Sequence, residues 1–368
     1  DTRTPRSRSS RRVVRRSGAL RFAAQCPGGL SREGCAGGAG AMMNSFVRID
    51  PNNVITMLAN NSEFGNGAYT VMSMMLAEEL DVDYRSIALE AAPTTPEYYS
   101  PLFREYLTAG SVTTGSTFMP MRTAGAKARA MLLEAASQDW QVPTAELTTE
   151  EGKVTHAASG RSSTYGELLE AIHRLDIQPP ETVALKDPSE FKILGKPARR
   201  YEGAGKVDGS AEFGIDIKLP GMLYGAIARP PVHSGSVIDF DATEALAMPG
   251  VVKVKAIRAG VVVLADSYWR AQKARAKLKI EWDRGVNDGV SSEQFYADYR
   301  ALADTPGLLA EDIGDAIGAL DEAEDVVEAT YEMPLLAHAT LEPMNCIARV
   351  EGDTCTIWSG TQYQSNDQ

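Results

Sequence analysis

The chain has 368 residues, of which 43% are hydrophobic and 23% charged, and its formal net charge is −12. This composition is that of a globular protein with room for two or three domains, and no apolar run approaches the roughly 18 residues that a membrane-spanning helix needs. The excess of acidic residues repels phosphate backbones, which argues against nucleic-acid binding.

The first 44 residues differ from the rest in charge. Residues 1–41 carry nine Arg, one Asp and one Glu, a charge of +7, which leaves −19 for the remainder. The arginine pairs Arg11-Arg12 and Arg15-Arg16 precede a small apolar stretch, as in a twin-arginine export signal. Arg21 and Gln25 interrupt that stretch, so a disordered arm explains the segment equally well. We therefore treat residues 1–44 as a leader outside the fold, and expect a periplasmic protein if it is an export signal and a cytoplasmic one otherwise.

The four cysteines contain no CxxC pair, so an iron–sulfur or structural zinc site is not expected. Cys346 and Cys355 fall in adjacent predicted strands. They would form a disulfide in an exported protein, and two buried free thiols are the alternative.

Hydrophobic periodicity predicts the elements of the first half in chain order. Residues 46–49 and 54–58 form a hairpin, and a glycine loop at 63–67 leads into a helix over 68–80. A strand at 85–91 and a second small-residue loop at 108–117 precede a helix over 118–140, whose small residues predict close packing against a flat neighbour. A hairpin at 147–156, a helix at 165–175 and a proline-containing linker at 179–188 follow.

From residue 192 the composition favours strands, which we expect at 209–217, 222–229, 251–257, 260–265 and 278–282. Two short helices interleave with them, one beginning at Asp241, which can cap it, and one over 267–276. A helical connector at about 291–322 and strands at 326–333, 346–350 and 354–359 end the chain. The order of elements predicts an α+β fold.

Two loops combine glycine with polar side chains ahead of a helix. In Glu63-Phe64-Gly65-Asn66-Gly67, free amides attract an anion such as a cofactor phosphate, although most loops of this kind only turn the chain. It is neither a P-loop nor a dinucleotide fingerprint. Thr113-Thr114-Gly115-Ser116-Thr117 offers hydroxyls and amides to an anion or a polar heterocycle, or serves as a helix N-cap. The pair is consistent with one ligand held from two sides.

The first loop resembles a known family pattern. Residues 63–70, Glu-Phe-Gly-Asn-Gly-Ala-Tyr-Thr, and residues 76–83, Leu-Ala-Glu-Glu-Leu-Asp-Val-Asp, are similar to E-M-G-Q-G-x-x-T and L-A-E-E-L-D-V-D. That pattern is typical of the xanthine dehydrogenase and aldehyde oxidase superfamily, in the branch of the isoquinoline 1-oxidoreductase beta subunits, which includes large subunits of periplasmic aldehyde dehydrogenases. The resemblance continues in order at 114–117, 156–161, 184–188, 195–197, 206–209, 213–216 and 337–345, and it covers nearly all of the chain from residue 46.

The resemblance implies a partial molybdopterin-binding domain plus an α/β hammerhead domain. Residues 45–180 would be the first part of the molybdopterin-binding domain and 195–285 the hammerhead domain. Residues 286–324 would be a helical connector, and 325–368 the truncated start of a second molybdopterin-binding region. Because family members continue well past this length, the glutamate that acts as general base is expected beyond Gln368. No catalytic residue or metal ligand is therefore expected within the chain.

The resemblance also implies cofactor contacts. Phe64, Gly65, Asn66 and Gly67 would approach the dithiolene end of a molybdenum-molybdopterin cofactor, in its plain or cytosine dinucleotide form. The family usually has Met and Gln at the first and third of these positions; Asn66 keeps the amide on a side chain one methylene shorter, and Phe64 is bulkier and has no sulfur. The run Thr114-Gly115-Ser116 would contact the pterin or its phosphate.

The implied activity is hydroxylation of an aldehyde or N-heterocycle with water as the oxygen source. Two electrons would leave through a small 2Fe-2S subunit, and a cytochrome c is a further possible acceptor. The alternative is a non-catalytic fragment or scaffold that folds without cofactor.

The histidines give no catalytic pattern. His156, His173 and His233 are interpreted as loop or surface residues without a catalytic partner. His338 and Glu342 have metal-ligand spacing only if they lie on a helix, and Pro343 argues against one. Glu342 is therefore expected to be a structural carboxylate.

Overall fold

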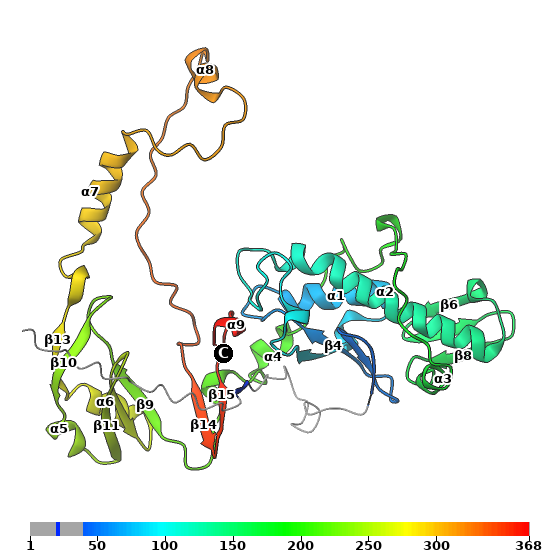
Figure 1. Ribbon diagram of the computed structural model, residues 1–368, viewed down its shortest axis with the longest axis horizontal. Coiled ribbons are helices and arrows are strands. Elements are labelled where there is room, and N and C mark those ends of the chain that lie inside the picture. The colour runs from blue at the N-terminus through cyan, green and yellow to red at the C-terminus, as the bar shows by residue number, and fades with distance from the viewer. Residues whose placement is uncertain (1–19, 23–39, 368) are drawn as a thin grey trace, which may run out of the picture. The chain divides into compact units, whose positions relative to one another are not determined.

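The computed structural model describes residues 20–22 and 40–367, which divide into two compact units (Figure 1). Of the described residues, the first unit comprises 20–22, 40–217 and 341–367, and the second comprises 218–340. Most of the expected leader lies outside the described residues. Its last residues, however, form strand β2 (Ala41–Asn44) with Met43 buried, so the leader boundary at residue 44 is wrong.

The main sheet of the first unit has the strand order β2-β3-β4-β5, with β3 at Val47–Ile49, β4 at Ile55–Ala59 and β5 at Ala88–Ala91. Strands β2, β3 and β4 are antiparallel neighbours, whereas β4 and β5 are parallel and are joined through helix α1 (Ala68–Leu80). This helix has the predicted bounds. The strand predicted at 85–91 is shorter because η2 (Tyr84–Ser86) precedes it, with the Asp83 side chain accepting from the Arg85 amide.

Helix α1 packs along helix α2 (Thr113–Trp140), and both cover the main sheet (Figure 1). The expected close packing of the small residues is confirmed, but the neighbour is a helix. A Cβ on Gly125 would lie 2.6 Å from the Leu76 carbonyl oxygen, so the two backbones nearly touch. The core between these elements is rich in methionine and leucine, including Met72, Met75, Leu76, Met121 and Leu132.

The C-terminal end of α1 concentrates negative charge, which the helix dipole disfavours. Glu78 accepts from the backbone amides of Lys192, Ile193 and Leu194 at 3.0, 2.7 and 2.9 Å. Glu79, whose side chain has no exposed surface, accepts from Arg122 at 2.8 Å. These bonds compensate the buried charge and tie the segment after the linker to the helix pair.

The remaining elements of the first unit are short. The predicted hairpin at 147–156 is confirmed as β6 (Leu147–Glu150) and β7 (Lys153–His156), and β8 (Arg161–Thr164) adds a third strand. The helix predicted at 165–175 is restricted to α3 (Leu169–Arg174). The strand predicted at 209–217 is wrong, because this stretch follows α4 (Gly203–Asp208) and contains η6 (Gly214–Asp216).

The two strands predicted at 346–350 and 354–359 are confirmed as β14 (Ile347–Glu351) and β15 (Thr354–Trp358), which form an antiparallel hairpin. Strand β1 (Leu20–Phe22) pairs in parallel with β15. Cys346 and Cys355 are free thiols, one exposed and one half-buried, so the expectation that both are buried is wrong. Four short elements complete this unit: η3 (Pro96–Tyr98), η4 (Thr144–Glu146), η5 (Pro188–Glu190) and α9 (Gln364–Asp367).

The second unit has a three-stranded antiparallel sheet in the order β11-β12-β9, with β9 at Tyr224–Ala228, β11 at Val251–Ile257 and β12 at Gly260–Ala265. Helix α6 (Tyr268–Arg275) packs on it through Ala271 and Ala274, and Ser267 caps this helix. Strands β10 (Ser236–Asp241) and β13 (Lys279–Asp283) form a separate antiparallel pair, of which the sequence predicts only the second.

The connecting segments of the second unit carry α5 (Thr243–Leu246), η7 (Gly285–Asn287), α7 (Ser292–Ala303) and α8 (Ala316–Asp321). Asp241 accepts from the Thr243 amide at 2.9 Å, but the N-cap of α5 is Ala242, so the expectation that Asp241 caps this helix is wrong. The predicted strand at 326–333 is wrong, because these residues are extended and exposed and pair with no strand in the described chain. No described helix is both long enough and apolar enough to cross a membrane.

Candidate cofactor-binding site

The Phe64–Gly67 loop turns sharply into α1. Gly65 and Gly67 have φ angles of 101° and 82°, a left-handed backbone that favours glycine. Phe64 is 54% exposed, and the Asn66 side-chain oxygen accepts from the Ala68 amide at 3.2 Å. A Cβ on Gly65 would meet no protein atom within 4 Å, so this side of the loop is open.

The amides ahead of α1 already have a partner, which the sequence did not indicate. The Glu63 carboxylate accepts from the Gly65 and Gly67 amides at 2.7 and 3.1 Å, and from the Tyr69 amide at 3.3 Å. Glu63 belongs to the motif that carries the family resemblance. Its role was missed because the sequence does not show whether a carboxylate before a glycine loop points toward the loop amides or into solvent. The expectation that these amides are free for an anion is therefore wrong.

The second loop is in fact the first turn of a helix. Helix α2 begins at Thr113, five residues before the predicted start, and Thr117 Oγ1 donates to the Thr113 carbonyl at 2.6 Å. Thr114 and Gly115 are exposed and Ser116 is half-buried. Among the described residues, no side chain caps this helix. Its first amides therefore point outward without a helical acceptor.

The same turn also offers an acceptor. Pro120 lies inside α2 and has no N–H, so the Ser116 carbonyl lacks the donor that normally comes from four residues on. A Cβ on Gly115 would meet no atom within 4 Å. Thus no contact within the described chain requires glycine at position 115. A ligand that approaches the backbone closely would require it, because any side chain would fill that space. Donors, an acceptor and open space fit a pterin with a phosphate tail.

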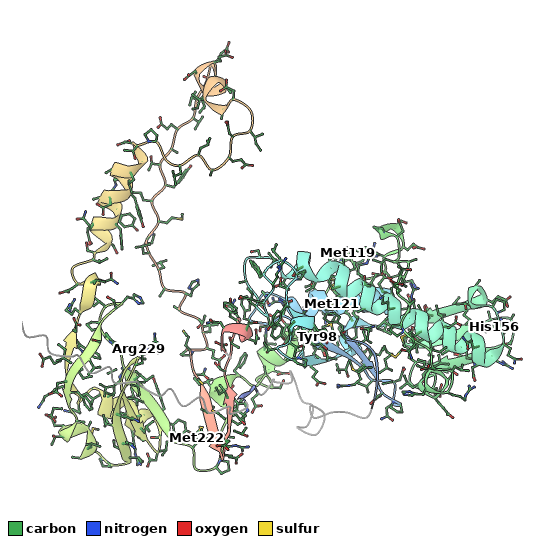
Figure 2. The ribbon with its side chains drawn as sticks, in the orientation of Figure 1. Tyr98, Met119, Met121, His156, Met222 and Arg229 are labelled. Carbon is green, nitrogen blue, oxygen red and sulfur yellow. The ribbon has the colours of Figure 1, made fainter. Side chains whose placement is uncertain are left out.

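Contacts between α1 and α2 run in the same order along both helices. Thr117 contacts Met75, Arg122 pairs with Glu79, and Arg129 approaches Asp81 at 3.7 Å. The helices therefore run in the same general direction, and both expected loops lie toward one end of the pair. Figure 2 shows this end of α2 at Met119 and Met121, and His156 at the opposite end.

A third segment, near the end of the sequence, joins this region. The Ser62 hydroxyl donates to the Thr361 carbonyl at 2.9 Å, and Gln364 Nε2 donates to the Ser62 hydroxyl at 2.7 Å. Gln362 exchanges two bonds with the Thr108 backbone, at 2.7 and 2.9 Å. These residues precede each loop and brace it. Sequence reasoning missed them because the contacts span more than 250 residues.

The expectation for His156 is wrong, whereas that for Glu342 is confirmed. His156 is buried rather than on the surface: its Nε2 lies 2.9 Å from Glu146 and its Nδ1 2.7 Å from Ser159, an arrangement that locks the turn between β7 and β8. Glu342 accepts from the Ile215 amide at 3.0 Å, which confirms a structural carboxylate. Among the described residues no group of three His, Cys, Asp or Glu side chains is placed to hold a metal ion.

An open pocket of about 480 Å³ lies elsewhere, beside the second half of α2. Asp81, Arg129 and Lys186 line it, and they pair with one another or with Glu79. None of the seven expected cofactor residues borders this pocket, and its charges serve the packing of α1 against the linker.

Comparison with known proteins places the chain among molybdopterin proteins. A family model described as a molybdopterin cofactor-binding domain matches residues 29–217, and a second model with the same description matches residues 302–368. The beta subunit of isoquinoline 1-oxidoreductase from Brevundimonas diminuta is 30% identical over 88% of this chain and 47% of its own length.

Two further relatives carry related names. A subunit of nicotinate dehydrogenase from Pseudomonas putida is 28% identical over 86% of this chain and 27% of its own length. The molybdenum-binding subunit of an aldehyde oxidoreductase from Escherichia coli, PaoC, is 24% identical over 47% of this chain and 27% of its own length. The chain thus spans less than half the length of these relatives.

Proposed function

This chain belongs to the family of molybdopterin-binding subunits of xanthine dehydrogenases and aldehyde oxidases, and from this premise we propose that it is part of a molybdenum hydroxylase. The proposed substrates are aldehydes or N-heterocycles, with water as the oxygen source. The names of the relatives support both substrate classes. The observation that carries the proposal is the open first turn of α2, at the same end of the α1–α2 pair as the glycine loop and inside the residues that the family model matches.

The first turn of α2 is the proposed contact for the phosphate end of the cofactor. Its outward amides and the positive end of the helix dipole favour an anion. The Thr114 hydroxyl adds a donor, and the Ser116 carbonyl would accept from a pterin N–H, whereas the Ser116 hydroxyl already donates to the Thr113 carbonyl at 3.4 Å. Gly115 lets the ligand approach the backbone, because no side chain stands between them.

The Phe64–Gly67 loop is the proposed second contact. Its exposed surface presents the Phe64 ring and the Asn66 side-chain amide, a mixture that suits a flat polar heterocycle, and Gly65 leaves room for close approach. When bound, the molybdenum-molybdopterin cofactor would supply the redox centre that accepts two electrons from the substrate. The residues of this chain would bind and orient it, and leave the reacting atoms to the cofactor and to groups elsewhere in the protein.

The proposed electron-transfer partner is a small 2Fe-2S subunit, with a cytochrome c as a further acceptor. Periplasmic localisation is proposed from the arginine-rich leader alone. The domain assignments for 45–180, 195–285, 286–324 and 325–368 remain proposals, as does the cytosine dinucleotide form of the cofactor.

The full chain, co-produced with the small 2Fe-2S subunit in a host that makes molybdopterin, tests this proposal. Molybdenum is measured by elemental analysis and pterin by fluorescence after its release from the protein. We expect both in equal amounts on the purified chain. A folded chain that carries neither would contradict the proposal.

A matched pair of variants tests the α2 contact. Gly115→Val fills the open space at the first turn, and Gly307→Val makes the same change at another glycine with no atom within 4 Å. Gly115→Val should lower the retained pterin about 10-fold or more, as expected for the loss of one close polar contact with a buried ligand. Gly307→Val should retain it, and equal pterin content in both variants would place the cofactor elsewhere.

A further inference from the structure

The carboxylate of Glu63 is enclosed as well as hydrogen-bonded. Its side chain is only 5% exposed, and Lys206 Nζ lies 3.7 Å from its Oε1. Lys206 also pairs with Glu202 at 3.3 Å, and Glu202 accepts from the Thr70 hydroxyl at 3.2 Å. The Arg200 guanidinium donates to the Gly65 carbonyl. Residues 200–206 thus cover the first turn of α1 and close the space around the carboxylate.

We propose that Glu63 is an internal anion that occupies the amide cluster ahead of α1 and so shapes the glycine loop before any cofactor binds. Three amides converge on this one carboxylate, which is the arrangement that a phosphate would otherwise take. A phosphate could reach them only by displacing a charged group that three backbone donors and a lysine hold in place. This inference rests on the proposed function, and makes Glu63 a positioning residue.

The proposal gives the two loops different roles in binding the cofactor. The α1 loop meets the cofactor through its outward surface, with its amides already satisfied. The α2 turn, which no carboxylate of the described chain caps, is left to take the anionic end. The cofactor would therefore lie with its phosphate toward Thr114 and away from Gly67.

Amide hydrogen exchange on the cofactor-free full chain tests the proposal directly. In Glu63→Ala, exchange at the Gly65, Gly67 and Tyr69 amides should accelerate by about 10-fold or more, because each loses a charge-assisted bond. Glu63→Gln keeps one acceptor oxygen, which can still serve the Gly65 and Gly67 amides, but replaces the oxygen that serves the Tyr69 amide by an NH2 donor. Exchange at the Tyr69 amide should therefore accelerate more than exchange at the two glycine amides. Glu134→Ala, an exposed carboxylate on α2, serves as the control and should leave these rates unchanged.

Added formate provides a readout that a purely structural role would not move. In Glu63→Ala, formate should enter the vacated position and slow exchange at the same three amides. In the unaltered chain neither formate nor inorganic phosphate should change the exchange rates of these three amides. If Glu63→Ala exchanges like the unaltered chain, or if formate fails to slow the variant, the proposal is wrong.

The unaltered chain decides the question even if both variants fail to fold. Protection of the Gly65, Gly67 and Tyr69 amides by inorganic phosphate would show that they remain open to an external anion, and would overturn the proposal. Strong protection without phosphate, unchanged on its addition, supports it. Because this measurement uses no cofactor, its outcome is separate from the molybdenum and pterin content that tests the proposed function.

Discussion

Replacing Arg122 by methionine removes the main partner of a fully buried carboxylate. Arg122 Nε and Nη2 donate to Glu79 Oε1 at 3.0 and 2.8 Å, and Nη2 also donates to the Lys186 carbonyl at 2.6 Å. The side chains of Glu79 and Arg122 are 0% and 6% exposed. The pair lies where α1 meets α2, so its loss acts on the packing that positions both loops.

The expected loss of stability in Arg122→Met depends on the partners that Glu79 retains. Removing one member of a buried ion pair costs about 3–5 kcal/mol, because the other charge stays buried without compensation. Without Arg122, Glu79 would still have Arg129 at 3.7 Å and would still accept from the Lys186 backbone amide at 3.3 Å. We therefore expect a loss of about 3 kcal/mol, the lower end of that range. In the double variant, Glu79→Met with Arg122→Met, both charges are gone and apolar groups fill the space, so the coupling energy should be about 2 kcal/mol.

Urea unfolding of the full chain, followed by the helical circular dichroism signal, measures these free energies for the two single variants and the double. The exposed pair of Arg174 and Asp139 is the control, with an expected coupling below about 1 kcal/mol. Should Arg122→Met cost less than about 1 kcal/mol, or should the double variant equal the sum of the singles, the reasoning about this buried pair is refuted.

Three further changes test the packing. Gly125→Val places atoms against the Leu76 carbonyl and should cost about 2–3 kcal/mol by overpacking, seen as a lower urea midpoint; an unchanged midpoint would mean that the helices can separate freely. Burial raises the pKa of Tyr165 above its unfolded value near 10, so its contribution is complete below pH 10 and is lost as the pH rises above it. Tyr165→Phe, which removes the bond to the Leu80 carbonyl, should flatten the alkaline decline in stability; an identical decline would contradict this. His156→Phe should cost about 1–2 kcal/mol and speed proteolysis of the adjoining turn, and resistance equal to the unaltered chain would rule out the locking role.

The parts of the fold that local sequence determines were predicted well. Helix α1 has the expected bounds because no Gly or Pro interrupts the run between Gly67 and Asp81, both of which adopt left-handed conformations. Strands β11 and β12 also match, since each alternates or runs apolar between clear turns. The family resemblance, carried by ordered motifs, is confirmed by the comparisons.

The errors occur where distant contacts override local composition. The run Thr113-Thr114-Gly115-Ser116 has the composition of a loop, yet packing of Thr117 against α1 extends the helix through it. The stretch 209–217 favours a strand, but Glu342 holds the Ile215 amide, from 127 residues away. The partner of the α1 amides was also missed, because only the folded loop shows where the Glu63 carboxylate points.

The bracing of Ser62 and Thr108 by residues 361–364 has a consequence for the order of folding. The bond between Thr108 and Gln362 joins residues that are 254 positions apart, and the whole second unit is synthesised between them. At the usual rate of about 5–20 residues per second, the later segment leaves the ribosome about 13–50 s after the earlier one. The nascent first unit therefore spends tens of seconds with the backbone next to both loops unpaired, and these bonds can form only after the whole second unit has been synthesised.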